Sequence, residues 1–232
     1  MPIRAVLFDV GGPIDTEEIY ERLIDRDIVD ALRAEGVDTS PADFAAANEW
    51  AIEVFAPNAY RAIIWRLTQG NQGVAERAYA AVSARAGERH QARGGIELRE
   101  GIGGLIGQLH ARGLVIGLVS NQSEHVIAEL ERAGIGKYFA HEAIRRRRFH
   151  KPDVRAFLQV SEELGMLPGE CIMVGDRVDN DIVPAKLLGM RTVLFRTGRH
   201  VRQQPRALDE VPDREVRTMD ELATAIEELV GR

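Results

Sequence analysis

The chain has 232 residues, a formal net charge of −6 and a pI near 5.6. This length allows one large domain or a core with an inserted subdomain, and the acidic balance argues against general binding to nucleic acid or anionic membranes, which needs a basic surface. The single cysteine, Cys171, excludes an internal disulfide framework. With no apolar run long enough for a membrane span or a signal segment, we expect a cytoplasmic protein.

A short apolar run near the amino terminus ends on a carboxylate. Ala5–Phe8 is too short for a helix and apolar on both faces, as in a parallel strand covered by helices on each side. Asp9 follows directly, and Gly11 and Gly12 let the backbone approach a ligand closely. Ligands bind at the carboxyl ends of strands in open α/β sheets, so this stretch predicts an acid at a binding edge. The alternative is an ordinary strand followed by a turn.

Residues 15–95 carry helical patterns throughout. The expected helices cover residues 16–36, 41–55, 59–67 and 74–93. A crossover between parallel strands needs only about a dozen or more residues, so most of this segment must be an inserted helical module with a return hinge at Gly94-Gly95. We expect a helical cap domain over 15–95 and a core formed by 1–14 and 96–232.

The remainder of the chain alternates between strands and helices. Strands are expected at 114–119, 171–174 and 191–195, and helices at 102–111, 124–133, 154–164, 179–188 and 219–230. Thr218 and Glu221 form a capping-box signature at the start of the last helix. This alternation predicts an α/β fold, a doubly wound Rossmann-like parallel sheet with the all-helical cap inserted.

Polar residues follow two later strands in the same manner as the first. Ser120-Asn121 and Gly175-Asp176 stand at strand ends, with Asp181 shortly after, and Lys151 precedes a helix. In a parallel sheet these groups converge with Asp9 on one edge. Carboxylates suit magnesium, whereas a hydroxyl, an ammonium and backbone N–H groups suit a phosphate.

Four short motifs in this order carry a family resemblance. They are Phe8-Asp9-Val10-Gly11-Gly12, Val119-Ser120-Asn121, Lys151-Pro152, and Gly175-Asp176 with Asp181. With them the chain resembles the haloacid dehalogenase-like (HAD) hydrolase superfamily, in its helical-cap phosphatase branch. The resemblance covers nearly the whole length. It implies a magnesium-dependent phosphatase of small phosphate monoesters.

The resemblance also implies roles in substrate binding and catalysis. Asp9 would be the nucleophile that takes the phosphoryl group. Ser120, the Asn121 backbone and Lys151 would hold the phosphate, with Gly12 leaving room for it. Lys151 would neutralise charge between Asp9 and the phosphoryl oxygens. Such chemistry depends mainly on positioning and charge stabilisation, and an aspartate nucleophile divides hydrolysis into two easier steps.

The same resemblance implies a magnesium site. Its ligands would be Asp9, the backbone carbonyl of Gly11, Asp176 and Asp181. The expected partner is a small phosphorylated metabolite, with no nucleic acid and no membrane, and the expected state is a monomer or homodimer.

The first motif departs from the family pattern. Family phosphatases usually carry a second aspartate where this chain has Gly11, and a threonine where it has Pro13, and the loop is one residue short before Asp15-Thr16-Glu17. General acid–base help is worth about 10²–10⁴-fold, so its loss would weaken turnover. Asp15 either replaces the missing acid or, as we favour, caps the next helix.

Two other functions stay open for this sequence. One is a protein of this fold with low or no activity. The other is a 2-haloacid dehalogenase-type hydrolase, a branch that also lacks the second aspartate but does not need paired acids such as Asp176 and Asp181. The run Arg145–Arg148 is interpreted as a solvated face rather than an anion-gathering patch.

Overall fold

The structure is a computed structural model that describes residues 1–140 and 148–231. It divides into two compact units, Met1–Glu17 with Ile96–Arg232, and Glu18–Gly95. The first joint differs from the expected boundary, because residues 15–17 belong with the core. Backbone contacts explain the difference: Asp15 forms a β-bridge with Leu98, and the Thr16 N–H donates to the Glu97 carbonyl at 2.9 Å.

The core contains a six-stranded parallel sheet with the strand order β3-β2-β1-β4-β5-β6. The strands are β1 (Ala5–Phe8), β2 (Val115–Leu118), β3 (Phe139–Ala140), β4 (Cys171–Gly175), β5 (Arg191–Phe195) and β6 (Arg214–Val216). Phe8 at the end of β1 lies beside Leu118 of β2 and Val174 of β4. The residues that follow these three strands therefore emerge at one edge, and the predicted Rossmann-like α/β fold is confirmed.

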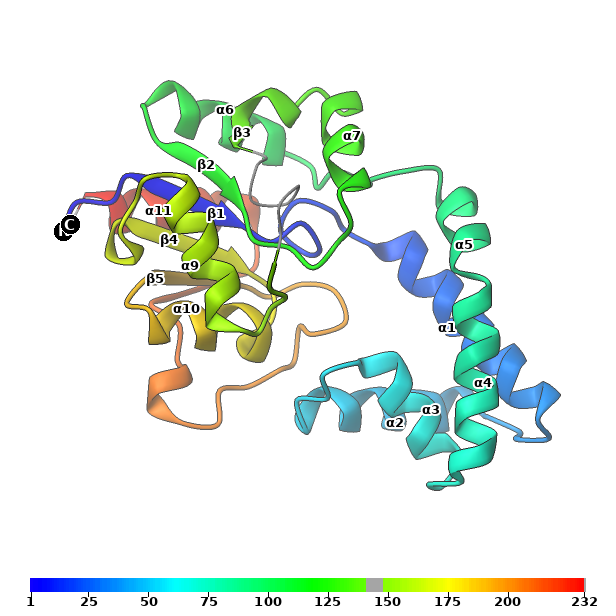
Figure 1. Cartoon of the computed structure of the whole chain (residues 1–232). Coiled ribbons are helices and arrows are strands. Elements are labelled where there is room, and N and C mark those ends of the chain that lie inside the picture. The colour runs from blue at the N-terminus through cyan, green and yellow to red at the C-terminus, as the bar shows by residue number, and fades with distance from the viewer. Residues whose placement is uncertain (141–147, 232) are drawn as a thin grey trace. The chain divides into compact units, whose positions relative to one another are not determined.

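Helices cover both faces of the sheet (Figure 1). They are α6 (Ile102–Ala111), α7 (His125–Arg132), α9 (Val154–Glu163), α10 (Val183–Leu187) and α11 (Met219–Val230). Val6 and Phe8 of β1 point to the core shared with α6, α7 and α11. Ala5 and Leu7 point to the opposite core, with α9 and α10. This alternation along a fully buried strand explains why β1 is apolar at every position.

The structure adds two strands to those expected and corrects two of the expected helices. Strands β3 and β6 were not expected, since two or three residues give no readable period. The helix expected at 179–188 is a π-helical turn, Val178–Ile182, followed by α10, where Pro184 lacks the N–H that would continue an α-helix. The helix expected at 74–93 is two helices, and at their junction the Arg85 N–H donates to the Val82 carbonyl.

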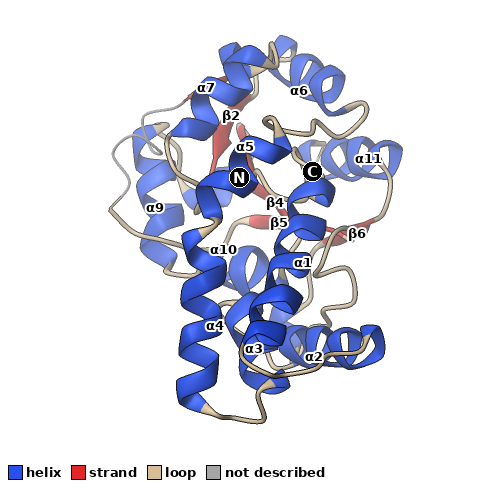
Figure 2. Cartoon of the chain, turned by 90° about the vertical axis from the view of Figure 1, so that its right-hand side faces the viewer, coloured by secondary structure: helices blue, strands red, loops and turns tan. Residues whose placement is uncertain are grey.

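The second unit is helical, as expected. Its helices are α1 (Glu18–Ala34), α2 (Pro41–Glu53), α3 (Ala59–Leu67), α4 (Gln72–Ala84) and α5 (Ala86–Arg93). Figure 2 draws all five in blue, and no strand occurs among residues 18–95, all of which the structure describes. The unit has its own apolar core, in which Ile28, Leu32, Ile63 and Ile64 are fully buried.

A membrane span is absent from the described part of the chain. None of its helices combines the length and the apolar character that crossing a bilayer requires.

Candidate active site

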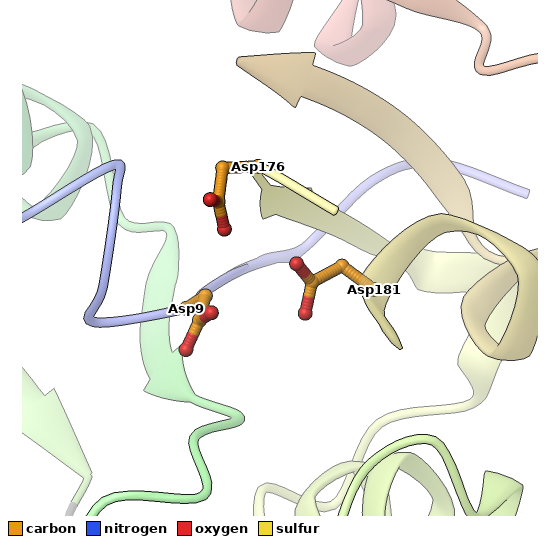
Figure 3. A group of neighbouring side chains, drawn as sticks. All are labelled: Asp9, Asp176 and Asp181. Carbon is orange, nitrogen blue, oxygen red and sulfur yellow. The ribbon is translucent and has the colours of Figure 1, made fainter. Parts of the chain in front are cut away.

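Three carboxylates meet at the carboxyl edge of the sheet. Asp9 follows β1, Asp176 follows β4, and Asp181 lies in the π-helical turn beyond β4. Figure 3 shows their side chains turned toward a common space, and one oxygen from each lies within 4.8 Å of the others. Ser120 stands beside them in the fold, after β2, and is buried. The structure thus brings together acids that are far apart in sequence.

Lys151 lies between two of these acids. Its Nζ is 2.9 Å from Asp9 Oδ2 and 2.6 Å from Asp181 Oδ1, and its side chain is 1% exposed. Burial opposes the ammonium charge, but Asp181 and Asp9 together raise the pKa of Lys151 above its ordinary value. The lysine is therefore a fixed positive charge that touches the proposed nucleophile.

The acids carry more negative charge than Lys151 balances. Burial, then Asp181 and Asp9, raise the pKa of Asp176 well above the ordinary range. Burial also raises the pKa of Asp181 to about 6, despite Lys151. Three crowded carboxylates with one ammonium fit a divalent cation, because hard oxygen ligands suit such ions and the ion would relieve the repulsion. This part of the chain can therefore hold a metal.

Two glycines are required by close approaches within the site. Gly12 has a φ of +82°, and a Cβ on it would lie 2.7 Å from the Asp176 side chain. A Cβ on Gly175 would lie 2.4 Å from the Asp181 carboxylate. A contact under 3.0 Å leaves no room for a side chain, so glycine at both positions lets the loops close around the acids.

The second and third motifs are joined by hydrogen bonds. The Lys151 N–H donates to Asn121 Oδ1 at 2.8 Å, and Asn121 Nδ2 donates to the Lys151 carbonyl at 2.9 Å. The Gln122 N–H donates to Ser120 Oγ at 3.2 Å. The sequence indicated the Asn121 backbone as a phosphate ligand, but the structural role of its side chain in holding Lys151 was missed.

Arg99 was also missed by sequence reasoning. Its Nε donates to the Gly12 carbonyl at 2.9 Å and its Nη2 to Thr197 Oγ1 at 2.7 Å. Its guanidinium lies 4.9 Å from the centre of the Phe195 ring. Arg99 thus ties the loop after β1 to the end of β5. No local pattern marks such a residue, because its partners are remote in sequence.

Asp15 does not have the capping position that we favoured. Helix α1 begins at Glu18, and Asp15 Oδ1 accepts from the Glu17 N–H at 3.1 Å and the Glu97 N–H at 3.2 Å. Asp15 is 1% exposed. Its carboxylate holds together the two chain segments that flank the insert, which also argues against its use as the missing acid.

The arginine run is only partly described by the structure. Arg145 to Arg147 lie outside the described residues. Arg148 is exposed, and its N–H donates to Gln159 Oε1 at 3.1 Å.

A comparison with protein-family models shows the family to which this chain belongs. The family model described as haloacid dehalogenase-like hydrolase matches residues 3–189. The chain belongs to this family. The match spans all four motifs of the site, so the resemblance predicted from them is confirmed for the haloacid dehalogenase-like family.

Known proteins of related sequence or fold are similar to this chain. The glyceraldehyde 3-phosphate phosphatase of Methanopyrus kandleri is 36% identical over 125 residues, which are 53% of each protein, so the chain spans about half of that relative's length. A crystal structure described as a predicted phosphoglycolate phosphatase from Haemophilus somnus has a TM-score of 0.68 at 17% identity, covering 97% of both chains. A magnesium-bound HAD-hydrolase from Bacillus subtilis has a TM-score of 0.59 at 18% identity, covering 97% of this chain and 99% of that one.

Proposed function

We propose that this haloacid dehalogenase-like hydrolase is a magnesium-dependent phosphatase of small phosphate monoesters, acting through an aspartyl-phosphate on Asp9. The observation that carries the proposal is the contact of Asp9 with Lys151 at 2.9 Å, at a sheet edge where Asp176 and Asp181 complete a metal-binding set. The site thus combines a carboxylate nucleophile, the positive charge of Lys151 and a place for a metal ion. Phosphoryl transfer depends on such positive charges around the phosphoryl oxygens.

The proposed metal would be held by the side chains of Asp9, Asp176 and Asp181 and by the Gly11 carbonyl. Magnesium, when bound, supplies positive charge for the phosphoryl oxygens and for the crowded carboxylates. The relative of this fold that was crystallised with magnesium supports this choice of ion.

The protein groups supply positioning and charge around the nucleophile. The Asp9 carboxylate attacks phosphorus, and Lys151, fixed by Asp181 and Asn121, balances the charge on the phosphoryl oxygens. Ser120 Oγ and the backbone N–H of Asn121 bind the phosphate. Water then attacks the aspartyl-phosphate and releases inorganic phosphate, which restores Asp9.

The proposed substrates are small phosphorylated metabolites. Triose phosphates and phosphoglycolate come first in a substrate screen. Related proteins are named glyceraldehyde 3-phosphate phosphatase and predicted phosphoglycolate phosphatase. Location in the cytoplasm and assembly as a monomer or homodimer stay predictions.

The site favours phosphoryl transfer over carbon–halogen displacement. A 2-haloacid carries its own carboxylate, which the excess negative charge around Asp9 would repel if no cation were present. A non-catalytic role is disfavoured because Asp9, Lys151 and Asp181 are all present and in contact.

The experiment is a phosphatase assay with 4-nitrophenyl phosphate and the metabolite screen. We expect chelation to abolish turnover, magnesium to restore it, and Asp9→Asn to fold normally but show no turnover. Asp38→Asn, which changes an exposed carboxylate of the helical unit, is the matched control and keeps activity. Unchanged turnover in excess chelator, or full activity in Asp9→Asn, would contradict the proposal. Release of halide from 2-haloacids without magnesium would support the dehalogenase instead.

A further inference from the structure

The Glu17 carboxylate occupies the space beside Gly11. A Cβ built on Gly11 would lie 2.6 Å from Glu17 Oε2 and 3.1 Å from Glu17 Oε1. Gly11 is the second residue after Asp9, where family phosphatases carry their second aspartate. A side chain at that position would thus point into the place that Glu17 fills. We propose that Glu17 is the general acid and base of this enzyme, in place of an aspartate at position 11; the proposal rests on the phosphatase function proposed above.

The conformation of Glu17 places its side chain there. Its φ is +57°, in the left-handed region that non-glycine residues rarely adopt. Such strain persists only where surrounding contacts hold it, and it gathers at functional sites. Two contacts hold this residue: the Glu17 N–H donates to Asp15 Oδ1 at 3.1 Å, and Gln122 Nε2 donates to Glu17 Oε1 at 3.1 Å. Gln122 follows the phosphate-binding pair Ser120-Asn121.

Burial separates Glu17 from the other acid of the loop. Asp15 is 1% exposed and its carboxylate binds backbone N–H groups, whereas Glu17 is partly exposed. A general acid and base must come within hydrogen-bond reach of the leaving group and of the attacking water, which a buried carboxylate bound to backbone N–H groups does not. Glu17 also stands on the same edge as the metal set, since it lies against Gly11 and the next residue, Gly12, lies against the Asp176 side chain.

The proposed reaction uses the Glu17 carboxyl group twice, first as an acid and then as a base. Protonated Glu17 gives its proton to the leaving oxygen while the bond from Asp9 to phosphorus forms and the bond from phosphorus to that oxygen breaks. The resulting Glu17 carboxylate then takes a proton from water as the water oxygen bonds to phosphorus and the bond to Asp9 breaks. The products are an alcohol, inorganic phosphate, the free Asp9 carboxylate and Glu17 in its starting form.

The first test compares Glu17→Gln with wild type on two leaving groups. The substrates are 4-nitrophenyl phosphate, whose leaving group departs as an anion, and the alkyl phosphate that wild type hydrolyses fastest. We expect alkyl phosphate turnover to fall about 10²–10⁴-fold. With the aryl substrate we expect a burst of about one nitrophenolate per enzyme, because the first step survives and the second loses its base. Glu18→Gln, the same substitution at the exposed neighbour, is the control and keeps both rates.

A rescue variant tests the position itself. Gly11 does not have a positive φ, so Asp fits its backbone once the Glu17 carboxylate is removed. We expect Glu17→Ala combined with Gly11→Asp to recover alkyl phosphate turnover by at least about tenfold over Glu17→Ala alone. In Gly11→Asp alone, the new aspartate must displace the Glu17 carboxylate from the same space. We therefore expect no gain in alkyl phosphate turnover over wild type. This test does not depend on the folding of Glu17→Gln. It compares Glu17→Ala with the double variant, and both of these lack the glutamate.

The outcomes separate this proposal from the phosphatase function. A wild type that hydrolyses aryl but no alkyl phosphates, a Glu17→Gln variant with unchanged alkyl phosphate turnover and no aryl burst, or a double variant no better than Glu17→Ala would each overturn the role of Glu17 while the phosphatase stands. Wild type inactive on every phosphate tested would remove the phosphatase function itself.

Discussion

Asn121 and Lys151 are joined by two hydrogen bonds between the Asn121 side-chain amide and the Lys151 backbone, although 30 residues separate them. At its other end Lys151 contacts Asp9 and Asp181. The lysine is thus fixed at both its backbone and its ammonium group. Its charge is in place before substrate arrives, which lowers the reorganisation needed for catalysis.

Removing the Asn121 amide should therefore affect both stability and turnover. We expect Asn121→Ala to lower the free energy of unfolding by about 1–3 kcal/mol, because two partly buried backbone groups of Lys151 lose their partner. Turnover should fall, while magnesium affinity changes little because no carboxylate is touched. Denaturant unfolding and magnesium titration measure these effects. Gln72→Ala, which removes an exposed amide whose partner is the Glu76 side chain, should stay within about 0.5 kcal/mol of wild type; equal losses in both variants would argue against this role of the Asn121 amide.

Stabilisation by magnesium should depend on pH. In the metal-free protein burial raises the pKa of Asp181 to about 6. The folded state therefore keeps a proton that the unfolded chain has lost, so this contribution to stability is complete below about pH 4 and is lost as the pH rises through about 6. Magnesium binds the deprotonated acids. We expect the rise in Tm on adding magnesium to be larger at about pH 7 than at about pH 5.

The measurement is the difference in Tm with and without magnesium at each pH, in buffers of equal ionic strength. Taking this difference cancels the titration of carboxylates elsewhere in the chain. A rise in Tm of the same size at both pH values would show that the acids are ionised before the ion binds.

Gly12 should not tolerate a side chain. Alanine at this position combines a left-handed backbone with a Cβ 2.7 Å from the Asp176 side chain. We expect Gly12→Ala to cost about 1–2 kcal/mol for the backbone and about 1–3 kcal/mol more for the overlap, with loss of turnover. Gly36→Ala is the matched control: its φ is +79°, but nothing lies within 4 Å of the added Cβ, so only the backbone cost is expected. Similar losses in the two variants would contradict this account of Gly12.

The helical unit contains a buried ion pair that should matter for its stability. Arg89 is 5% exposed, and its Nη1 donates to Asp27 Oδ2 and to the Val82 carbonyl, each at 2.7 Å. We expect Arg89→Met to lower the free energy of unfolding by about 1–3 kcal/mol, because Asp27 loses its buried partner but keeps its ion pair with Arg85. Arg33→Met breaks an exposed pair with Asp30 and should cost about 0–1 kcal/mol. Denaturant unfolding followed by far-UV circular dichroism measures both; equal effects would mean that Arg89 is effectively solvated.

The sequence by itself determined the α/β class, the central strands and the motif residues at their ends. Ala5–Phe8 shows why: a short, wholly apolar run ending on Asp9 can be buried on both faces only in a covered parallel sheet. The cap of the last helix was equally readable, since Thr218 accepts a hydrogen bond from the Glu221 backbone N–H, three residues on. These features depend on neighbours along the chain.

Only the tertiary structure decided the short strands, the break before α10 and the arrangement of the loop after β1. Strand β3 has two residues and exists because β2 offers it hydrogen bonds. The loop after β1 shows most clearly what the sequence does not reveal. Both Asp15 and Glu17 can be read from the sequence, but only the structure shows that Asp15 binds backbone N–H groups and that Glu17 lies beside Gly11. That choice depends on the left-handed backbone at Glu17 and on partners as distant as Glu97 and Gln122, which no local pattern encodes.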